Sequence, residues 1–478
     1  MGKSINCKYF SKNNFDQFKA TLRLETALLA QWFKDKTFDE DGKSIGMEIE
    51  AWLVDQDFLP APQNEKFLAT LNHPNVVAEL SQFNIEINVP PQKLDAFCLS
   101  RMHADIKNIW QAAQRMASSM GLKILMTGSL PTLRNEHLST DTISNRDRYK
   151  ALNEQIMQLK AGADMNIAID GDDSLKVNHP DVMMEAATTS MQIHLKTPAS
   201  QMNRYFNASI ICSAPLVALS ANTPFVFGKS LWDETRIPVF EQAVNLPGFF
   251  DVTGHYINRV GFGEAYVRSS ILEFFLDNLD SYPVILPIQF DQPSEQLPHL
   301  LLHHGTIWRW NRPVIGVGQK SKPHLRIEER VCPAGPTIRD TMASTAFYLG
   351  LTHSLASQVI PPESLLSFNQ ARSNFYAAAK SGLSARVVWL DGSEGDMQSL
   401  LLHKLLPLAK SGLKEFGIAD EDIKFYLDET VAPRLRNGQN GSFWQRMYTS
   451  IHGNDFQKMT EKYFYYQESD LPVHLWEI

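Results

Sequence analysis

Four short segments of the chain alternate apolar and polar residues, which is the pattern of a β-strand with one buried and one open face. In the segment around Glu48, for example, Met47, Ile49 and Ala51 alternate with the glutamates. Because successive side chains of a strand point to opposite faces, the apolar residues of each segment share one face. The pattern predicts strands over residues 44–54, 85–89, 189–197 and 322–331. Together they predict an antiparallel sheet whose apolar face packs on a core.

The polar face of these strands is rich in groups that bind metals and phosphates. Its residues come in pairs: Glu48 with Glu50, Glu86 with Asn88, Gln192 with His194, and Glu328 with Arg330. One such segment alone would fit an ordinary half-exposed strand. Four together do not, because carboxylates gathered on one sheet repel each other unless a cation lies between them. The face therefore predicts a site for a divalent metal and a polyphosphate. Glu329 lies on the apolar face, beside Ile327, so we expect no catalytic role for it.

Apolar residues at helical spacing fill much of the remaining chain. They predict helices over residues 10–34, 95–120, 147–159, 200–219, 298–310 and 338–358. A short buried strand is expected at residues 123–127. Glycine and aspartate are frequent in residues 162–180, so we expect an exposed loop there. Its acidic residues lack the spacing and the closing glutamate of a calcium loop.

After Pro361 and Pro362 the pattern is almost wholly helical. It predicts helices over residues 369–381, 395–416, 420–435 and 443–467. We expect a catalytic domain over residues 1–360 and a helical part over residues 361–478 that packs on the same fold. The alternative is that the whole chain forms one single domain.

Composition narrows the classes of function. The chain has 478 residues, of which 44% are hydrophobic and 21% are charged, as in an ordinary globular protein. Its net charge of −8 argues against nonspecific binding to nucleic acid or to anionic membranes, since both need positive charge. The most apolar run, residues 210–227, is interrupted by serine, asparagine and proline, so no membrane span is expected. Small molecules are the expected partners, and an oligomer remains open.

The cysteines bear on the cellular compartment. Cys7, Cys98, Cys212 and Cys332 are far apart and form neither a CxxC pair nor a zinc-type spacing. This usage predicts reduced, mostly buried thiols in a cytoplasmic protein. The N-terminus has no apolar signal segment. The sequence also has no Walker loop, no Gly-x-Gly-x-x-Gly fingerprint and no Gly-x-Ser-x-Gly elbow.

Over about residues 44–445 the chain resembles the glutamate–cysteine ligase type-2 family of ATP-dependent carboxylate–amine ligases. The motifs that carry the resemblance are Gly46-Met47-Glu48-Ile49-Glu50, the paired acids Glu79 and Glu86, Arg148-Tyr149, Gln192-Ile193-His194, Ala221-Asn222-Thr223-Pro224-Phe225 with Arg236 downstream, Glu328-Glu329-Arg330, and residues 440–445. Each is weak alone, and their order makes the case. The chain departs from the family in the segment Glu185-Ala186-Ala187-Thr188 ahead of the Gln-x-His strand, where Cys or Gly is frequent, and in the length of segment 162–180. Both departures flank the expected substrate pocket.

The resemblance implies an α+β fold of the glutamine-synthetase type, with a curved antiparallel β-sheet that forms a funnel and helices behind it. It implies an enzyme that activates a carboxylate, the γ-carboxylate of glutamate, as an acyl phosphate and joins it to an amine such as cysteine, releasing ADP and phosphate. ATP would be a substrate, and Mg²⁺ or Mn²⁺ the cofactor.

The same reasoning assigns roles to individual residues. The expected metal ligands are Glu48, Glu50, Glu86, His194 and Glu328. The expected catalytic residues are Arg330 and Glu328, with Arg330 and Arg148 on the ATP phosphates and with Gln192, Arg236 and Glu79 on the substrates. Outside this set, we expect His303 and His304 to be structural or solvated. Whether Arg309 and Arg312 lie on the surface or turn inward stays open.

Other functions fit the same residues. A kinase would transfer phosphate without needing an amine, and a metal-dependent hydrolase would use the same acids and His194 to activate water. A non-catalytic relic of the fold is disfavoured, since it has no reason to keep repelling charges together. The sequence does not identify the acceptor amine.

Overall fold

A seven-stranded antiparallel sheet forms the centre of the computed structural model, which describes residues 10–246, 258–318 and 322–478. The strand order is β12-β13-β7-β1-β3-β2, and β4 also pairs with β1. The strands are β1 (Ser44–Val54), β2 (Val76–Ala78), β3 (Asn84–Lys93), β4 (Lys123–Leu125), β7 (Met191–Thr197), β12 (Asn311–Gly316) and β13 (His324–Glu329). The antiparallel sheet expected from the alternating segments is therefore confirmed, and the bounds of β1 agree with the sequence pattern.

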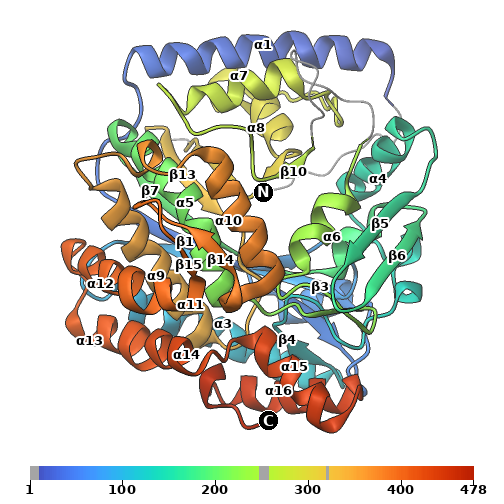
Figure 1. Cartoon of the computed structure of the whole chain (residues 1–478). Helices are drawn as coiled ribbons and strands as arrows, with labels where there is room; N and C mark the ends of the chain where they lie inside the picture. The colour runs from blue at the N-terminus through green and yellow to red at the C-terminus, as the bar shows by residue number, and fades with distance from the viewer. Residues whose placement is uncertain (1–9, 247–257, 319–321) are drawn as a thin grey trace.

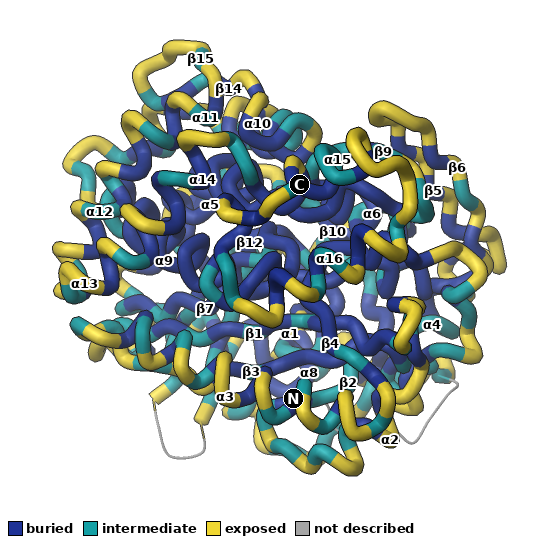
Figure 2. The backbone as a smooth tube through the Cα atoms, turned by 90° about the horizontal axis from the view of Figure 1, so that it is seen from below, coloured by how far each residue is buried: buried dark blue, intermediate teal, exposed yellow. Residues whose placement is uncertain are grey.

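Helices cover the apolar face of this sheet. The helices in this part of the chain are α1 (Lys12–Lys34), α2 (Asn64–Leu71), α3 (Cys98–Ser119), α4 (Asp147–Leu159), α5 (Met202–Ser220), α6 (Arg236–Ala243), α7 (Leu272–Ser281), α8 (Pro298–His304) and α9 (Ile338–Ala356). Helix α3 packs on β3, α5 on β12 and β13, and α9 on β7 and α5. Nearly every residue of α5 and α9 is buried, as expected for helices with protein on all sides. Figure 2 shows these elements as the dark centre of the molecule, with exposed backbone at its rim.

The inner face of the sheet holds one acid, as strand parity requires. Glu329 is 1% exposed and accepts hydrogen bonds from Ser209 of α5 and from the backbone of Val331. Burial raises its pKa to about 8. The prediction that Glu329 points away from the polar face is confirmed.

The C-terminal helices pack on the helical side of the molecule (Figure 1). They are α10 (Phe368–Ser381), α11 (Met397–Leu400), α12 (Leu406–Glu415), α13 (Asp420–Ile423), α14 (Ala432–Asn437), α15 (Gly441–His452) and α16 (Phe456–Glu468). A π-helical turn joins α11 to α12 and another joins α13 to α14, so each pair is one continuous helical segment. Helix α10 packs on α5, and α12 packs on α9. The division of the chain near residue 360 stays a prediction.

The opposite end of the molecule is closed by α1, which lies across α7 and α8 (Figure 1). Glu25 of α1 accepts hydrogen bonds from the His299 ring (2.7 Å) and from the backbone of Leu300 (2.8 Å). His303 and His304 contact Asn278 of α7 and are buried, so they have a structural place and are not solvated.

The prediction of an exposed loop at residues 162–180 is wrong. The segment forms a hairpin of β5 (Met165–Asp170) and β6 (Ser174–His179). Met165, Ile167 and Ile169 are buried and alternate with exposed residues. The sequence therefore contains the two-residue period of a strand, although the segment as a whole is polar. An acid of the hairpin turn links it to the C-terminal helices, since Asp172 forms an ion pair with Arg446 of α15 (2.7 Å).

Two expected helices are also shorter in the structure. Residues 298–310 are helical only to His304, because Trp308–Arg309 (β11) pairs with Val260–Gly261 (β10). The helix expected over residues 443–467 is two helices, α15 and α16, separated at Gly453, where φ is +79°. The remaining strands form small two-stranded sheets: β8 (Phe225–Val226) with β9 (Lys229–Ser230), and β14 (Arg386–Val388) with β15 (Glu394–Asp396). None of the helices in the described ranges combines the length and apolar character needed to cross a membrane.

Candidate active site

The strand register brings the polar residues of four distant segments side by side. Glu50 of β1 lies opposite Glu86 of β3. On the other side of β1, Glu48 lies opposite Gln192 of β7. His194 of β7 in turn lies opposite Glu328 of β13. The chemistry-bearing face expected from the alternating pattern is therefore assembled across four neighbouring strands.

Three carboxylates on this face come closest to one another. Glu50, Glu79 and Glu86, hereafter the acid triad, each offer an oxygen within 4.8 Å of the other two, the closest such grouping in the described part of the chain. Glu79 lies just after β2, and its carboxylate accepts the backbone N–H of Leu80 (3.1 Å). Asn88 donates to Glu86 (2.8 Å). Glu79, expected to bind substrate, is thus placed with two of the expected metal ligands.

The acid triad is electrostatically strained without a cation. Burial, and then the charge of Glu79, raises the pKa of Glu50 to about 7. Burial and the neighbouring carboxylates also raise the pKa of Glu86 well above its usual range. Burial raises the pKa of Glu79, although Arg148 opposes the shift. Oxygen donors at this spacing fit Mg²⁺ or Mn²⁺, which would neutralise the three charges.

A second cluster on the same face is built from arginines around Glu328. Arg312 of β12 donates to Glu328 (2.9 Å), and Arg330 donates to both Glu328 and Gln192. Burial disfavours the Glu328 charge, but Arg312 and Arg330 together lower its pKa well below the usual range. Unlike the acid triad, Glu328 is therefore a stable carboxylate held by positive charge. Arg312 turns inward, which settles the alternative left open for it.

His194 links the two clusters. Its Nε2 lies 3.2 Å from a carboxylate oxygen of Glu48, and its Nδ1 accepts a hydrogen bond from Arg326 (3.2 Å). In that arrangement Nε2 carries the ring proton, but it makes no hydrogen bond to Glu48. Metal ligation through Nε2 would require the other tautomer and a rearranged Arg326. The roles of Glu48 and His194 as metal ligands stay predictions.

Two arginines outside the sheet lie near these clusters. Arg236, at the start of α6, is 3% exposed, donates to the backbone oxygen of Arg330 (2.8 Å) and lies 5.0 Å from the ring centroid of Trp310. Its Nε is buried with no hydrogen-bond partner, although Glu234 lies 3.5 Å away. Arg148, in the first turn of α4, donates to the hydroxyl of Tyr149 (2.7 Å).

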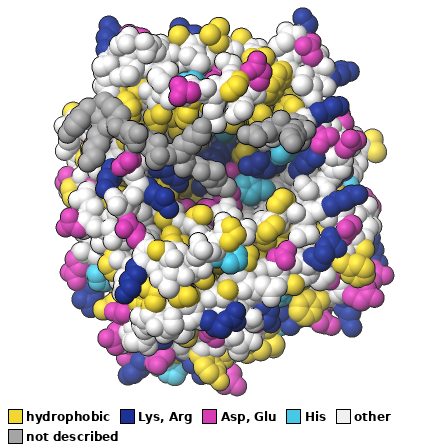
Figure 3. All heavy atoms as spheres, turned by 180° about the vertical axis from the view of Figure 1, so that it is seen from behind, with side chains coloured by type: hydrophobic (Ala, Val, Ile, Leu, Met, Phe, Trp, Pro, Cys, Tyr) yellow, Lys and Arg dark blue, Asp and Glu magenta, His cyan; other side chains and the backbone are white. Residues whose placement is uncertain are grey.

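Some residues at the site had no assigned role in the sequence. Arg326 lies two residues before Glu328 on β13, so strand parity could have found it. Glu185 lies near the acid triad from outside the sheet, and no periodic pattern marks it. Figure 3, seen from the side opposite to Figure 1, shows a hollow in which basic, acidic and histidine side chains gather.

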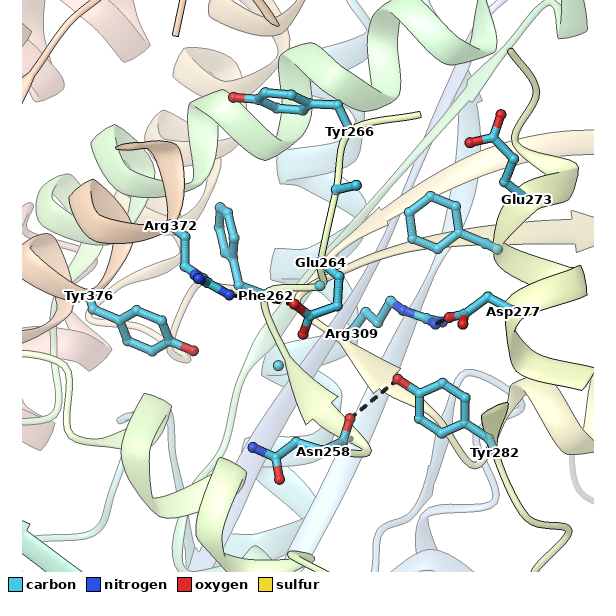
Figure 4. Close-up of a pocket in the computed structure, with 14 residues that line it drawn as sticks. Asn258, Phe262, Glu264, Tyr266, Glu273, Asp277, Tyr282, Arg309, Arg372 and Tyr376 are labelled. Carbon is cyan, nitrogen blue, oxygen red and sulfur yellow. Dashed lines mark hydrogen bonds and ion pairs between the residues drawn. The ribbon is translucent and has the colours of Figure 1, made fainter. Parts of the chain in front are cut away.

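A cavity of about 450 Å³ shares none of its lining residues with this face (Figure 4). Arg309 in its wall is 5% exposed and pairs with Asp277 of α7 (2.5 Å), so this arginine also turns inward. Tyr376 lines the same cavity and donates to Glu241, which also accepts from Trp310 (both 2.8 Å). Since Trp310 also contacts Arg236, the side chains of Tyr376, Glu241 and Trp310 connect the wall of the cavity to a residue of the candidate active site.

The thiols lie in packed surroundings. Cys98, Cys212 and Cys332 are buried, free cysteines, and burial raises the pKa of each. Cys332 accepts a hydrogen bond from Ser220 (3.5 Å). A protonated, buried thiol is a poor nucleophile, so these three fit packing roles. Cys7 lies outside the described residues, and a cytoplasmic location stays a prediction.

Comparisons with known proteins agree with this arrangement. The model of glutamate-cysteine ligase family 2 matches residues 44–459. The chain is similar in structure to a glutamate–cysteine ligase from Francisella tularensis in complex with AMP, with 12% identity, a TM-score of 0.53 and 90% of each chain covered. It is also similar to a bifunctional glutathione synthetase from Pasteurella multocida, with 12% identity and a TM-score of 0.50, covering 95% of this chain and 54% of that one. No curated protein sequence matches significantly. At such identities the likenesses show a shared fold, and the funnel shape stays a prediction.

Proposed function

The chain belongs to glutamate-cysteine ligase family 2, a family of ATP-dependent carboxylate–amine ligases, and we propose that it joins the γ-carboxylate of glutamate to an amine through an acyl phosphate. The observation that carries the proposal is the acid triad beside an arginine cluster on one face of the sheet. Such a pair of clusters suits phosphoryl transfer, in which positioning and charge neutralisation do most of the work.

The acid triad is where we place the divalent cation. Glu50, Glu79 and Glu86 would hold it, with Glu48 and Glu328 as further candidates on the same face. When bound, Mg²⁺ or Mn²⁺ would neutralise phosphate oxygens of ATP. The chain's own contribution is to hold three repelling carboxylates together, two on neighbouring strands and one on the turn after β2.

The arginines would stabilise the phosphoryl group in transfer. Arg330 is fixed by Glu328 and Gln192, so its planar guanidinium needs little reorganisation when negative charge develops beside it. Arg312 shares Glu328 and keeps that carboxylate ionised. Arg148, near Glu79, is a candidate for a second phosphate contact.

The carboxylate substrate would lie between these clusters. Arg236 is buried, with an Nε that lacks a hydrogen-bond partner, so it can bind a carboxylate at little reorganisation cost. Gln192 contacts both Glu50 (3.3 Å) and Arg330, which joins the metal side to the phosphate side. The γ-carboxylate oxygen would attack the terminal phosphorus of ATP, displacing ADP and leaving an acyl phosphate. The amine would then attack the acyl carbon, releasing phosphate.

Two rival functions make different demands on substrates. A kinase would release ADP with the acid alone and would keep the phosphorylated acid as its product. A metal-dependent hydrolase would turn over without ATP. The acid triad fits either rival, and the family membership favours the ligase.

The test is a coupled ADP-release screen of the purified protein, with glutamate crossed against a panel of amino acids and amines. We expect Mg²⁺-dependent ADP release that requires glutamate and one class of amine together. ADP release with glutamate alone, equal in rate and accompanied by accumulating phosphorylated acid, would favour the kinase instead.

A further inference from the structure

Glu185 lies on a short 3-10 helix, Val182–Ala187, that leads into β7. The other five residues of this helix are buried, and Glu185 alone is half-buried. The helix is packed against α6, which begins at Arg236, and against α4, which carries Arg148 in its first turn. The side chain of Glu185 therefore extends from a segment held between the two helices that supply the arginines of the site.

The backbone around Glu185 is firmly held. Asp181 accepts a hydrogen bond from the N–H of Met183 (2.8 Å) and caps the helix. Asn153 of α4 accepts from the N–H of Val182 (3.1 Å), and Ser129 donates to the carbonyl of Ala187 (2.9 Å). These contacts come from three different parts of the chain, so the position of Glu185 is fixed by the fold.

The electrostatic surroundings of Glu185 are those of the candidate active site. Burial, and then the charges of Glu79 and Glu50, raise its pKa to about 8, while Arg330 and Arg148 oppose the shift. Glu79 and Glu50 belong to the acid triad, and Arg330 belongs to the arginine cluster around Glu328. Arg148 lies outside the sheet, near Glu79. Glu185 is thus, like Glu48, a further carboxylate close to the acid triad.

Within the described ranges, Glu185 differs from the other acids of the site because its carboxylate has no hydrogen bond or ion pair. Glu50 accepts from Ser190, Glu86 from Asn88 and Glu328 from two arginines. A divalent cation would offset the acid triad, and the arginines offset Glu328. The half-buried carboxylate of Glu185 has no ion-pair partner among the described residues, and a positively charged ligand group would stabilise its ionised form.

We propose that Glu185 is a specificity residue that binds the ammonium group of an amino substrate in the candidate active site. The inference rests on the proposed ligase function and deepens it, because it restricts the substrates to compounds that arrive with a protonated primary amine. Two groups have this chemistry: the α-ammonium of the glutamate donor, and the amine of the acceptor before it loses its proton.

The experiment compares wild type, Glu185→Gln, Glu185→Asp and Glu468→Gln in the ADP-release assay. Glu468, at the end of α16, is a matched control, because its carboxylate accepts a hydrogen bond from Trp110 of α3 (3.3 Å), away from the site. We expect Glu185→Gln to raise the KM of the ammonium-bearing substrate by about 10- to 100-fold, the value of a charge-assisted hydrogen bond. The KM of ATP should stay unchanged, Glu185→Asp should restore part of the loss, and Glu468→Gln should behave as wild type.

Two substrate analogues distinguish the sources of the ammonium group. Glutarate lacks the α-ammonium of glutamate. If Glu185 binds that group, wild type should prefer glutamate over glutarate, and Glu185→Gln should lose this preference. Hydroxylamine is an acceptor that is uncharged at neutral pH. If Glu185 binds the acceptor instead, Glu185→Gln should impair charged amines and leave hydroxylamine unaffected.

The proposal is overturned if Glu185→Gln leaves the KM of both substrates unchanged, whether or not kcat falls. Absence of wild-type turnover with every substrate pair would count against the proposed function, and calorimetric titration then tests Glu185 separately. A lower affinity of Glu185→Gln for glutamate or for the amines, with unchanged affinity for the uncharged analogues, supports the proposal. Equal affinities of the two proteins for every charged compound overturn it.

Discussion

Replacing Glu86 by glutamine should harm activity and at the same time stabilise the metal-free protein. Glu86 faces Glu50 across the β1–β3 pair, and Glu79 is the third member of the acid triad. Glutamine keeps the shape of the side chain and the oxygen that accepts from Asn88, but it removes one of three repelling charges. The same change removes a ligand that the proposed metal needs.

The size of the stabilising effect follows from the distances. Two full charges at the 4.8 Å limit of the acid triad repel by about 3.5 kcal/mol at an effective dielectric constant of ~20. Burial and the neighbouring carboxylates raise the pKa of Glu86, so protonation relieves part of the repulsion. We therefore expect Glu86→Gln to add ~1–3 kcal/mol to the stability of the metal-free protein at about pH 8, which is a rise of a few degrees in melting temperature.

Glu328→Gln is the matched comparison on the same face. Glu328 is held by Arg312 and Arg330, so removing its charge leaves two half-buried guanidinium groups without their carboxylate partner. We expect this variant to lose stability by ~2–4 kcal/mol. Both variants should lose about 10²- to 10³-fold in rate, because each removes a charge that the phosphoryl transfer uses.

The assay measures thermal unfolding and ADP release for wild type and both variants, in chelator and in excess Mg²⁺. Wild type should melt higher with Mg²⁺, since binding to the folded state alone stabilises it. Glu86→Gln should melt above wild type in chelator and should lose most of its response to Mg²⁺. A lower melting temperature for Glu86→Gln in chelator, together with an undiminished Mg²⁺ response, would refute the reasoning.

Three further predictions concern other groups of the site. Arg330→Lys should lower kcat by about 10²-fold, because lysine cannot keep the two contacts to Gln192 and Glu328 in one plane; a full rate would make Arg330 a structural ion pair. The carboxyl of Glu50 has an unfolded pKa of about 4.3 and a folded pKa of about 7, so the stability of the metal-free protein should fall as pH rises through this window, and the melting shift caused by Mg²⁺ should grow. A decrease in the Mg²⁺ shift between pH ~5 and ~7.5 would contradict this assignment. Replacing all four cysteines by alanine should keep turnover, with a modest loss of stability; loss of turnover in a folded Cys332→Ala protein would show that a thiol takes part.

The strands of the sheet, and the residues on its polar face, could be predicted from the sequence because both follow from the two-residue period of a β-strand. The alternation around Glu48 gives the bounds of β1, and parity alone puts Glu329 on the helical side, where it contacts Ser209. The residue types on that face then narrow the chemistry, since repelling carboxylates need a cation.

The composition of the acid triad could not be predicted in this way. Glu79 lies outside the regular strands, and its place beside Glu50 and Glu86 depends on how the chain turns between β2 and β3. Glu185 is similar, because it reaches the site from a 3-10 helix that packs between α4 and α6. Tertiary packing decides both positions, and no periodic signal reports it.

Long-range pairing explains the element errors. Trp308–Arg309 reads as the end of a helix, but its partner strand, Val260–Gly261, lies far away in sequence. In the β5–β6 hairpin the buried face of Met165, Ile167 and Ile169 was visible, yet the polar turn dominated the interpretation.

The most direct test of the central claim follows one oxygen atom. Glutamate labelled with ¹⁸O in its γ-carboxylate is incubated with ATP, Mg²⁺ and the amine that supports ADP release, and the inorganic phosphate is analysed by mass spectrometry. An acyl phosphate requires one labelled oxygen to pass into phosphate in each turnover. Phosphate that carries no ¹⁸O while the amide product forms would contradict the account, and label in AMP would assign the activation to adenylation.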